Sequence, residues 1–157
     1  DGGQLACVGA GGAVATDAVA PVPAEFTVEF QPQLLANADQ VKVAMADDTA
    51  LVDGRPVAQY SGKQKAPVVR VAGTIPTAVN IEQSNFYDGK FATSDVVARL
   101  TAAAGVTPQE KTITFCNTGH WASIAWFGLS EVGGNQNVAL YDGSMAEWTL
   151  DEARPVQ

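Results

Sequence analysis

The sequence predicts an α/β fold in which a central parallel sheet carries helices on both faces. Short apolar or β-branched runs, such as residues 51–52 and 112–115, alternate with longer segments whose apolar residues recur at helical spacing. Strands and helices in this alternation form parallel sheets covered on both sides. With 157 residues, 46% of them hydrophobic and 17% charged, the chain is long enough for one domain with its own core.

The first third of the chain passes from a linker composition into the predicted domain. Residues 15–25 are rich in alanine and proline and are expected to be extended. Residues 26–30 alternate apolar and polar, which indicates a short strand or a segment lying across the domain surface. A helix is then expected over residues 40–46, with its start at residues 37–39.

The next elements alternate between strands and a helix. Residues 51–52 are expected to form a buried strand with Asp53 as its polar end, and residues 78–81 a second short strand. A helix is predicted over residues 95–104 because Thr93 and Ser94 are suitable capping residues, and Gly105 is typical of a helix end.

The centre of the prediction is a strand over residues 112–115, followed by Cys116, a polar loop and a helix over residues 121–132 that Gly133 ends. Open α/β sheets bind their ligands at the carboxyl ends of strands, where Cys116 is placed. Backbone N–H groups of such a loop and the positive end of a helix favour a thiolate. We therefore interpret Cys116 as a nucleophile; the alternative is a small buried hydrophobic residue.

The residues that follow Cys116 are poorly suited to a core and well suited to holding an anion. Asn117 and Thr118 offer side-chain donors, and Gly119 permits unusual backbone angles. His120, the only histidine, can pair with a thiolate or hold an anionic donor, although a structural role is the alternative. Trp121 is expected to form a pocket wall, with the core as its alternative place.

Four segments of the chain resemble, in order and spacing over residues 35–150, those of the rhodanese-like sulfurtransferases. Residues 51–56 are similar to that family's strand ending in Asp-x-Arg, and residues 73–80 to its Gly-His-Ile-Pro-Gly-Ala-x-Asn segment. Residues 115–123 resemble its active-site loop, and residues 140–148 its closing strand and helix. The resemblance implies a rhodanese-like fold, with a central parallel sheet and helices on both faces.

The resemblance also implies an activity. A sulfane sulfur would pass from thiosulfate, or a similar small sulfur-containing anion, to a thiophilic acceptor such as cyanide or a thiol through a persulfide on Cys116. No metal or organic cofactor is implied. Asp53 and Arg55 are secondary candidates that orient the loop, or else an ion pair that fixes the turn. The substrate-binding candidates are Asn117, Thr118, Gly119, His120 and Trp121.

Departures from the family pattern leave the donor open between thiosulfate and mercaptopyruvate. Many thiosulfate-using members carry Arg and Lys where this chain has Asn117 and Thr118. Two-domain members frequently have a substrate arginine where Gln59 stands. Thr74 and Thr77 replace the usual His and Gly of the second segment.

Three other functions compete with a small-molecule sulfurtransferase. The related phosphatases need an arginine six residues after the cysteine, and Ala122 stands there, which argues against phosphoryl chemistry. A non-catalytic module that only binds a partner, and a carrier that passes sulfur to a protein partner, both stay open. Non-catalytic modules often lose the cysteine, which this chain retains.

A weak internal repeat suggests how the chain is divided. Residues 1–7 align with residues 142–148, beginning at the shared Asp-Gly. We therefore expect residues 1–14 to be the tail of a preceding rhodanese domain, residues 15–32 an interdomain linker, and residues 33–157 the catalytic domain. That preceding domain is expected as a separate, non-covalently bound chain. A disordered Gly/Ala-rich leader is the alternative for residues 1–14.

Charge and composition narrow the choice of partners and of cellular location. The formal net charge of −8 argues against nucleic acid or an anionic membrane surface as partner. No apolar run approaches the length of a membrane span. Cys7 and Cys116 are expected as free thiols, because a disulfide would consume the nucleophile. The acidic balance and few lysines favour a periplasmic or other extracytoplasmic bacterial location over the cytoplasm.

Overall fold

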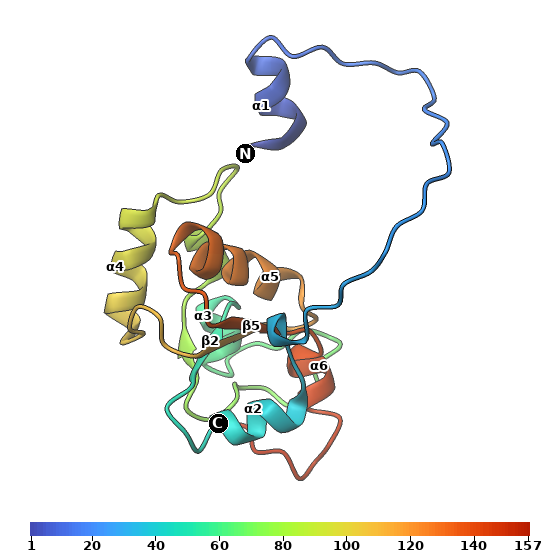
Figure 1. Ribbon diagram of the computed structural model, residues 1–157. Helices are drawn as coiled ribbons and strands as arrows, with labels where there is room; N and C mark the ends of the chain where they lie inside the picture. Colours follow the sequence, from blue (N-terminus) through green and yellow to red (C-terminus); the bar gives the residue numbers. More distant parts are fainter.

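A computed structural model describes all 157 residues, and its centre is a five-stranded, entirely parallel sheet (Figure 1). The strands follow the order β1-β5-β4-β2-β3, so that β4 lies in the middle with β5 and β2 beside it. This arrangement confirms the predicted fold class. The strands are β1 (Leu35–Ala36), β2 (Ala50–Asp53), β3 (Val79–Asn80), β4 (Thr112–Phe115) and β5 (Val138–Tyr141).

Helices cover both faces of this sheet. Figure 1 shows α4 and α5 on one side and α2 and α6 on the other. Two short helices, α1 and α3, and three single turns complete the chain. The helices are α1 (Gly3–Gly9), α2 (Ala38–Ala44), α3 (Val57–Tyr60), α4 (Ser94–Ala104), α5 (His120–Phe127) and α6 (Ser144–Trp148); the turns are η1 (Pro32–Leu34), η2 (Gln83–Asn85) and η3 (Gly128–Val132).

The core is divided by the sheet into two clusters, because successive strand side chains point to opposite faces. Leu51 packs with α2 and α6, whereas its neighbour Val52 packs with α4 and α5. All four residues of β4 are buried, which places this strand at the centre of both layers. The first cluster also contains the fully buried Trp148 and Tyr141, whose rings meet edge to face.

Most helix boundaries agree with the sequence prediction. Asn37 begins α2 through a capping box with Gln40, and Gly105 ends α4 in the left-handed conformation at φ 76°. The helix expected over residues 121–132 is shorter. It ends at Phe127 and continues as the wider π-type turn η3, where Gly128 leaves room for the ring of Phe86.

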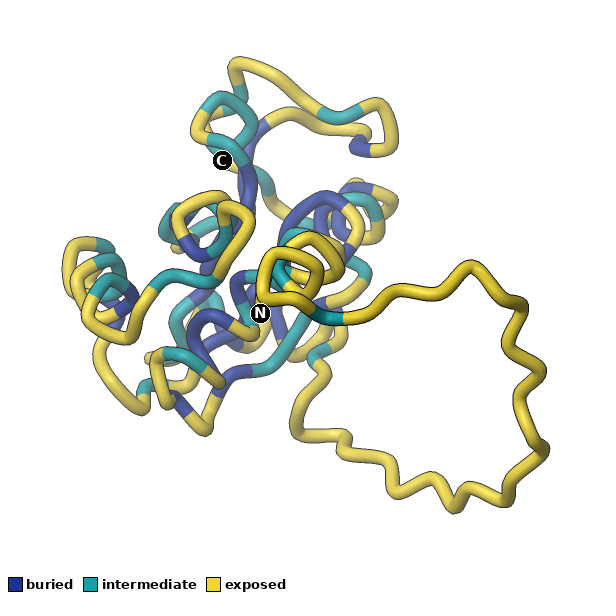
Figure 2. The backbone as a smooth tube through the Cα atoms, turned by 90° about the horizontal axis from the view of Figure 1, so that it is seen from above, coloured by how far each residue is buried: buried dark blue, intermediate teal, exposed yellow.

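The segment before η1 stands away from the domain, and its burial pattern corrects one prediction. Residues 10–31 have no regular structure and form the exposed arc of Figure 2. Phe26 and Phe30 are 87% and 70% exposed, so residues 26–30 neither form a strand nor lie across the surface. Alternation forms a strand only where a sheet edge receives it, and this segment pairs with none.

None of the helices combines the length and the apolar character needed to cross a membrane.

A buried ion pair closes the carboxyl end of β2. Arg55 Nη2 lies 2.6 Å from Asp53 Oδ2, and both side chains are completely buried. Thr74 Oγ1 donates to the same carboxylate at 2.7 Å, and Arg55 Nη2 donates to the carbonyl of Gly73 at 2.7 Å. Asn80 Nδ2 donates to the carbonyls of Asp53 and Arg55. The ion pair therefore ties the end of β2 to residues 73–74, and Asn80 ties it to β3.

We predict that Arg55→Leu lowers the free energy of unfolding by about 3–5 kcal/mol, because it leaves the Asp53 carboxylate buried without its counter-ion. Urea unfolding followed by circular dichroism measures this loss. Adding Asp53→Leu to the variant should recover part of it. Arg99→Leu, at an exposed site on α4, is the control and should change stability by no more than about 0.5 kcal/mol. An Arg55→Leu loss no larger than the control's would contradict the structural role.

Candidate active site

Cys116 lies at the carboxyl end of the central strand. It follows β4 directly, and the loop over residues 116–119 leads into α5, which begins at His120. The Cys116 side chain is only 1% exposed, and both Cys116 and Cys7 are free thiols. Because β2 and β5 flank β4, residues from their carboxyl ends surround the loop. The site is therefore assembled from distant parts of the chain.

The hydroxyl group of Ser144, at the start of α6, binds two backbone amides of the loop. Ser144 Oγ accepts hydrogen bonds from the backbone N–H of Cys116 at 3.0 Å and of Gly119 at 3.2 Å. Both lone pairs of the oxygen are thereby used. Its one hydrogen faces two acceptors, the carbonyl of Tyr141 at 2.9 Å and Cys116 Sγ at 4.0 Å.

The first turn of α6 completes this attachment. The backbone N–H of Met145 donates to the carbonyl of Cys116, and that of Ala146 to the carbonyl of Asn117, both at 3.0 Å. Ser144 itself adopts φ 51°, a left-handed conformation that residues other than glycine seldom take. Sequence reasoning did not identify Ser144, although the residue stands in the closing Asp-Gly-Ser segment.

The backbone amides of the loop divide into two groups. The N–H groups of Cys116 and Gly119 are already occupied by Ser144. The other five donate to no backbone or side-chain acceptor: Asn117, Thr118, His120, Trp121 and Ala122.

The predicted side chains of the loop lie in different surroundings. Asn117 is 7% exposed, and its Nδ2 donates to Oε1 of Gln59 on α3 at 2.8 Å. Thr118 and His120 are exposed, with Thr118 Oγ1 3.5 Å from His120 Nδ1. Trp121 is half-buried. Contact with Gln59 was not foreseen, because sequence reasoning treated this position only as a missing arginine.

The absence of a side chain at Gly119 leaves room for an acidic group beside the loop. Its φ is 87°, and a Cβ atom at this position would collide with the carboxylate of Asp142, so only glycine fits. Asp142 follows β5 and is exposed to solvent. Burial raises the pKa of the neighbouring Tyr141 phenol above its ordinary value.

Asp53 and Arg55 lie behind the loop and make no hydrogen bond to its side chains. Their link to it is indirect: the backbone N–H of Gly54 donates to the carbonyl of Phe115 at 2.9 Å, directly before Cys116. The charge of Arg55 is neutralised by Asp53. These two residues therefore support the strand end on which Cys116 is mounted.

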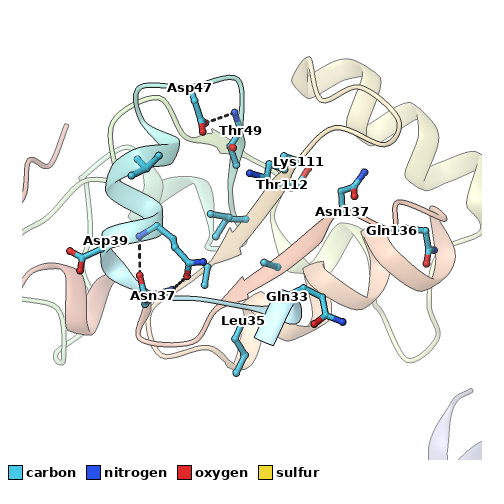
Figure 3. Close-up of a pocket in the computed structure, with 15 residues that line it drawn as sticks. Gln33, Leu35, Asn37, Asp39, Asp47, Thr49, Lys111, Thr112, Gln136 and Asn137 are labelled. Atoms are coloured by element: carbon cyan, nitrogen blue, oxygen red, sulfur yellow. Dashed lines mark hydrogen bonds between the residues drawn. The ribbon is translucent and has the colours of Figure 1, made fainter. Parts of the chain in front are cut away.

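Neither of two other features of the structure adds to the site. No three His, Cys, Asp or Glu side chains come together as a set of metal ligands. A cavity of about 660 Å³ lies at the opposite edge of the sheet, lined by α2 and by residues at the starts of β4 and β5 (Figure 3). Asn37, Lys111 and Asn137 line this cavity, and none of the candidate site residues does.

Known proteins resemble this chain in sequence. Residues 37–151 match the model of the family described as "Rhodanese-like domain". A Haloferax volcanii protein named "Putative thiosulfate sulfurtransferase" is 37% identical over 78% of this chain and 45% of its own length. A Mycolicibacterium smegmatis protein of the same name is 36% identical over 68% of this chain and 42% of its own. The chain thus spans less than half the length of these relatives.

Solved structures resemble it in fold. The anaerobic ergothioneine biosynthesis enzyme from Chlorobium limicola, in complex with trimethyl histidine, has a TM-score of 0.85 at 26% identity. The match covers 99% of this chain and 40% of that one. The family match spans most of the residues, and the parallel sheet and the placement of Cys116 agree with it. This chain belongs to the rhodanese-like domain family.

Proposed function

We propose that this chain is a sulfurtransferase that moves a sulfane sulfur from thiosulfate, or a similar donor, to a thiophilic acceptor such as cyanide or a thiol. The observation that carries the proposal is the placement of Cys116 at the end of β4, in a loop with five unoccupied backbone N–H groups. The names of the sequence relatives support the donor class. A structure at 25% identity described as holding a cysteine persulfide supports the intermediate.

The first half of the reaction loads the enzyme. The Cys116 thiolate attacks the outer sulfur of thiosulfate, a new S–S bond forms, and the old S–S bond breaks as sulfite leaves with the electron pair. The product is a Cys116 persulfide that carries one negative charge on its outer sulfur. The free amides of the loop are the donors available to that charge.

The second half returns the thiolate. Cyanide attacks the outer sulfur, thiocyanate leaves, and the bonding electrons stay on Cys116 Sγ. Ser144 serves both halves, because its single hydrogen can turn from the carbonyl of Tyr141 toward Sγ whenever that sulfur is negatively charged. No proton needs to be taken up or released at carbon or oxygen in either step, so a general base is not required.

We further propose that residues 1–14 pack against a second rhodanese domain, bound non-covalently as a separate chain. The apolar side chains of Leu5 and Val14 are 89% and 59% exposed. Exposed apolar side chains of this kind are expected where a segment packs against a partner. The repeat supports the proposal, because α1 begins at Gly3 and α6 at the aligned Ser144, both with left-handed φ (63° and 51°). Residues 15–32 would then be the interdomain linker.

Native mass spectrometry and light scattering of the natively purified protein test this partner. We expect a complex heavier than the 16.3 kDa chain that dissociates into two different polypeptides in denaturant. A stable 16.3 kDa monomer with full sulfurtransferase activity would refute both the partner and any contribution it makes to catalysis.

For Cys116 we predict that thiosulfate adds the mass of one sulfur atom to the protein and that cyanide removes it. Cys116→Ser should neither gain this mass nor form thiocyanate, because it lacks the attacking thiolate. Cys7→Ser is the matched control and should behave like the native protein, since Cys7 is exposed on α1, outside the loop. Turnover by Cys116→Ser would exclude the proposed mechanism.

For His120 we predict a role in donor binding. Its side chain is exposed at the start of α5, beside the free amides, in a loop without lysine or arginine. His120→Ala should raise the KM for thiosulfate about fivefold and leave kcat within about twofold. Steady-state thiocyanate formation measures both constants, and His120→Gln, which keeps hydrogen-bonding groups, should lie between. A collapse of kcat at unchanged KM would instead give His120 a chemical role.

A further inference from the structure

The side-chain amides of Asn117 and Gln59 form a hydrogen-bonded pair next to the nucleophile. Asn117 follows Cys116 directly, and its side chain is held by Gln59 Oε1 from α3, while its carbonyl accepts the N–H of Ala146 from α6. Asn117 Oδ1 is buried without a hydrogen-bond partner, and Gln59 is half-buried. The pair fixes Asn117 between two elements, and it does so without any formal charge.

The charges around this pair favour a weakly charged ligand. Residues 116–123 contain no lysine or arginine, and Arg55 is neutralised by Asp53. The carboxylate of Asp142 packs against Gly119 and contributes a negative charge beside the loop. Within residues 116–123, positive potential comes from the partial charges of the five free N–H groups, and His120 is the one side chain of this segment that can add a full positive charge. Partial charges of this kind suit one anionic sulfur better than a dianion.

We infer that Gln59, acting through Asn117, makes the Cys116 site selective for sulfur donors with a single negative charge over dianionic thiosulfate. The inference rests on the proposed function and specifies its donor class. Gln59 is a positioning residue, because it holds the side chain next to the nucleophile and keeps that position neutral. Thiosulfate remains a usable donor, with a higher KM than a monoanion of similar shape.

Two donors of similar shape and different charge test this selectivity. Methanethiosulfonate carries one negative charge and thiosulfate two, and both present an outer sulfur to a thiolate. With methanethiosulfonate, the Cys116 thiolate takes the outer sulfur and methanesulfinate leaves with the electron pair of the broken S–S bond. Both donors therefore give the same persulfide, and cyanide releases it as thiocyanate in both assays. The native chain should show about tenfold higher kcat/KM with methanethiosulfonate.

Variants at Gln59 separate charge from geometry. Gln59→Glu keeps an oxygen that can accept from Asn117 Nδ2 and adds a negative charge. It should raise the KM for thiosulfate about fivefold while changing the KM for methanethiosulfonate less than about twofold. Gln59→Arg adds a cation and should remove most of the preference by lowering the KM for thiosulfate. Gln136→Glu and Gln136→Arg make the same charge changes at the opposite edge of the sheet. They should leave the KM for both donors unchanged.

The outcomes distinguish this inference from the function on which it rests. Equal or better use of thiosulfate by the native chain would overturn the inference, and so would Gln59 variants that shift both donors by the same factor. Both results would leave sulfur transfer itself intact. A persulfide from neither donor would overturn the proposed function and the inference together.

Discussion

The double hydrogen bond from the Cys116 and Gly119 amides to Ser144 Oγ is the contact on which the shape of the site depends. It bends residues 116–119 around one oxygen. The amides of residues 120–122 are free for a separate reason, because they open α5 and the first N–H groups of a helix have no intrahelical acceptor. The cost is visible at Ser144, whose left-handed backbone is unfavourable for a residue with a Cβ atom. The start of α6 holds that conformation in place through its bonds to Cys116 and Asn117.

Support for the loop comes from every neighbouring strand end. β2 contributes the Asp53–Arg55 pair and the bond from Gly54 to Phe115, and β5 leads into Asp142 and Ser144. A fully buried ion pair is unfavourable to desolvate, and replacing it by apolar residues is often neutral. Its position suggests that it serves to fix the turn behind Cys116, because its hydrogen bonds reach both Thr74 and Gly73.

The sequence was most informative where the signal lies within one short segment of the chain. β4 and the helices α2 and α4 could be predicted, because periodicity and the residue types at helix ends are local properties, although Thr93 makes no side-chain capping bond at the start of α4. Cys116 was found from its place between a strand and a helix. Ser144 and Gln59 could not be found in this way, since their partners lie 28 and 58 residues away and nothing local encodes the contact. Residues 26–30 were misjudged because alternation alone does not supply a strand partner.

A crystal structure of the persulfide form, prepared with thiosulfate and kept from acceptors, would test whether the free amides bind the transferred sulfur. If they do, the outer sulfur should lie within hydrogen-bonding distance of at least two of the five unoccupied N–H groups of residues 117–122. Ser144 Oγ should still accept from the amides of Cys116 and Gly119. An outer sulfur that points into solvent, with no amide contact, would contradict the proposed origin of the site's chemistry.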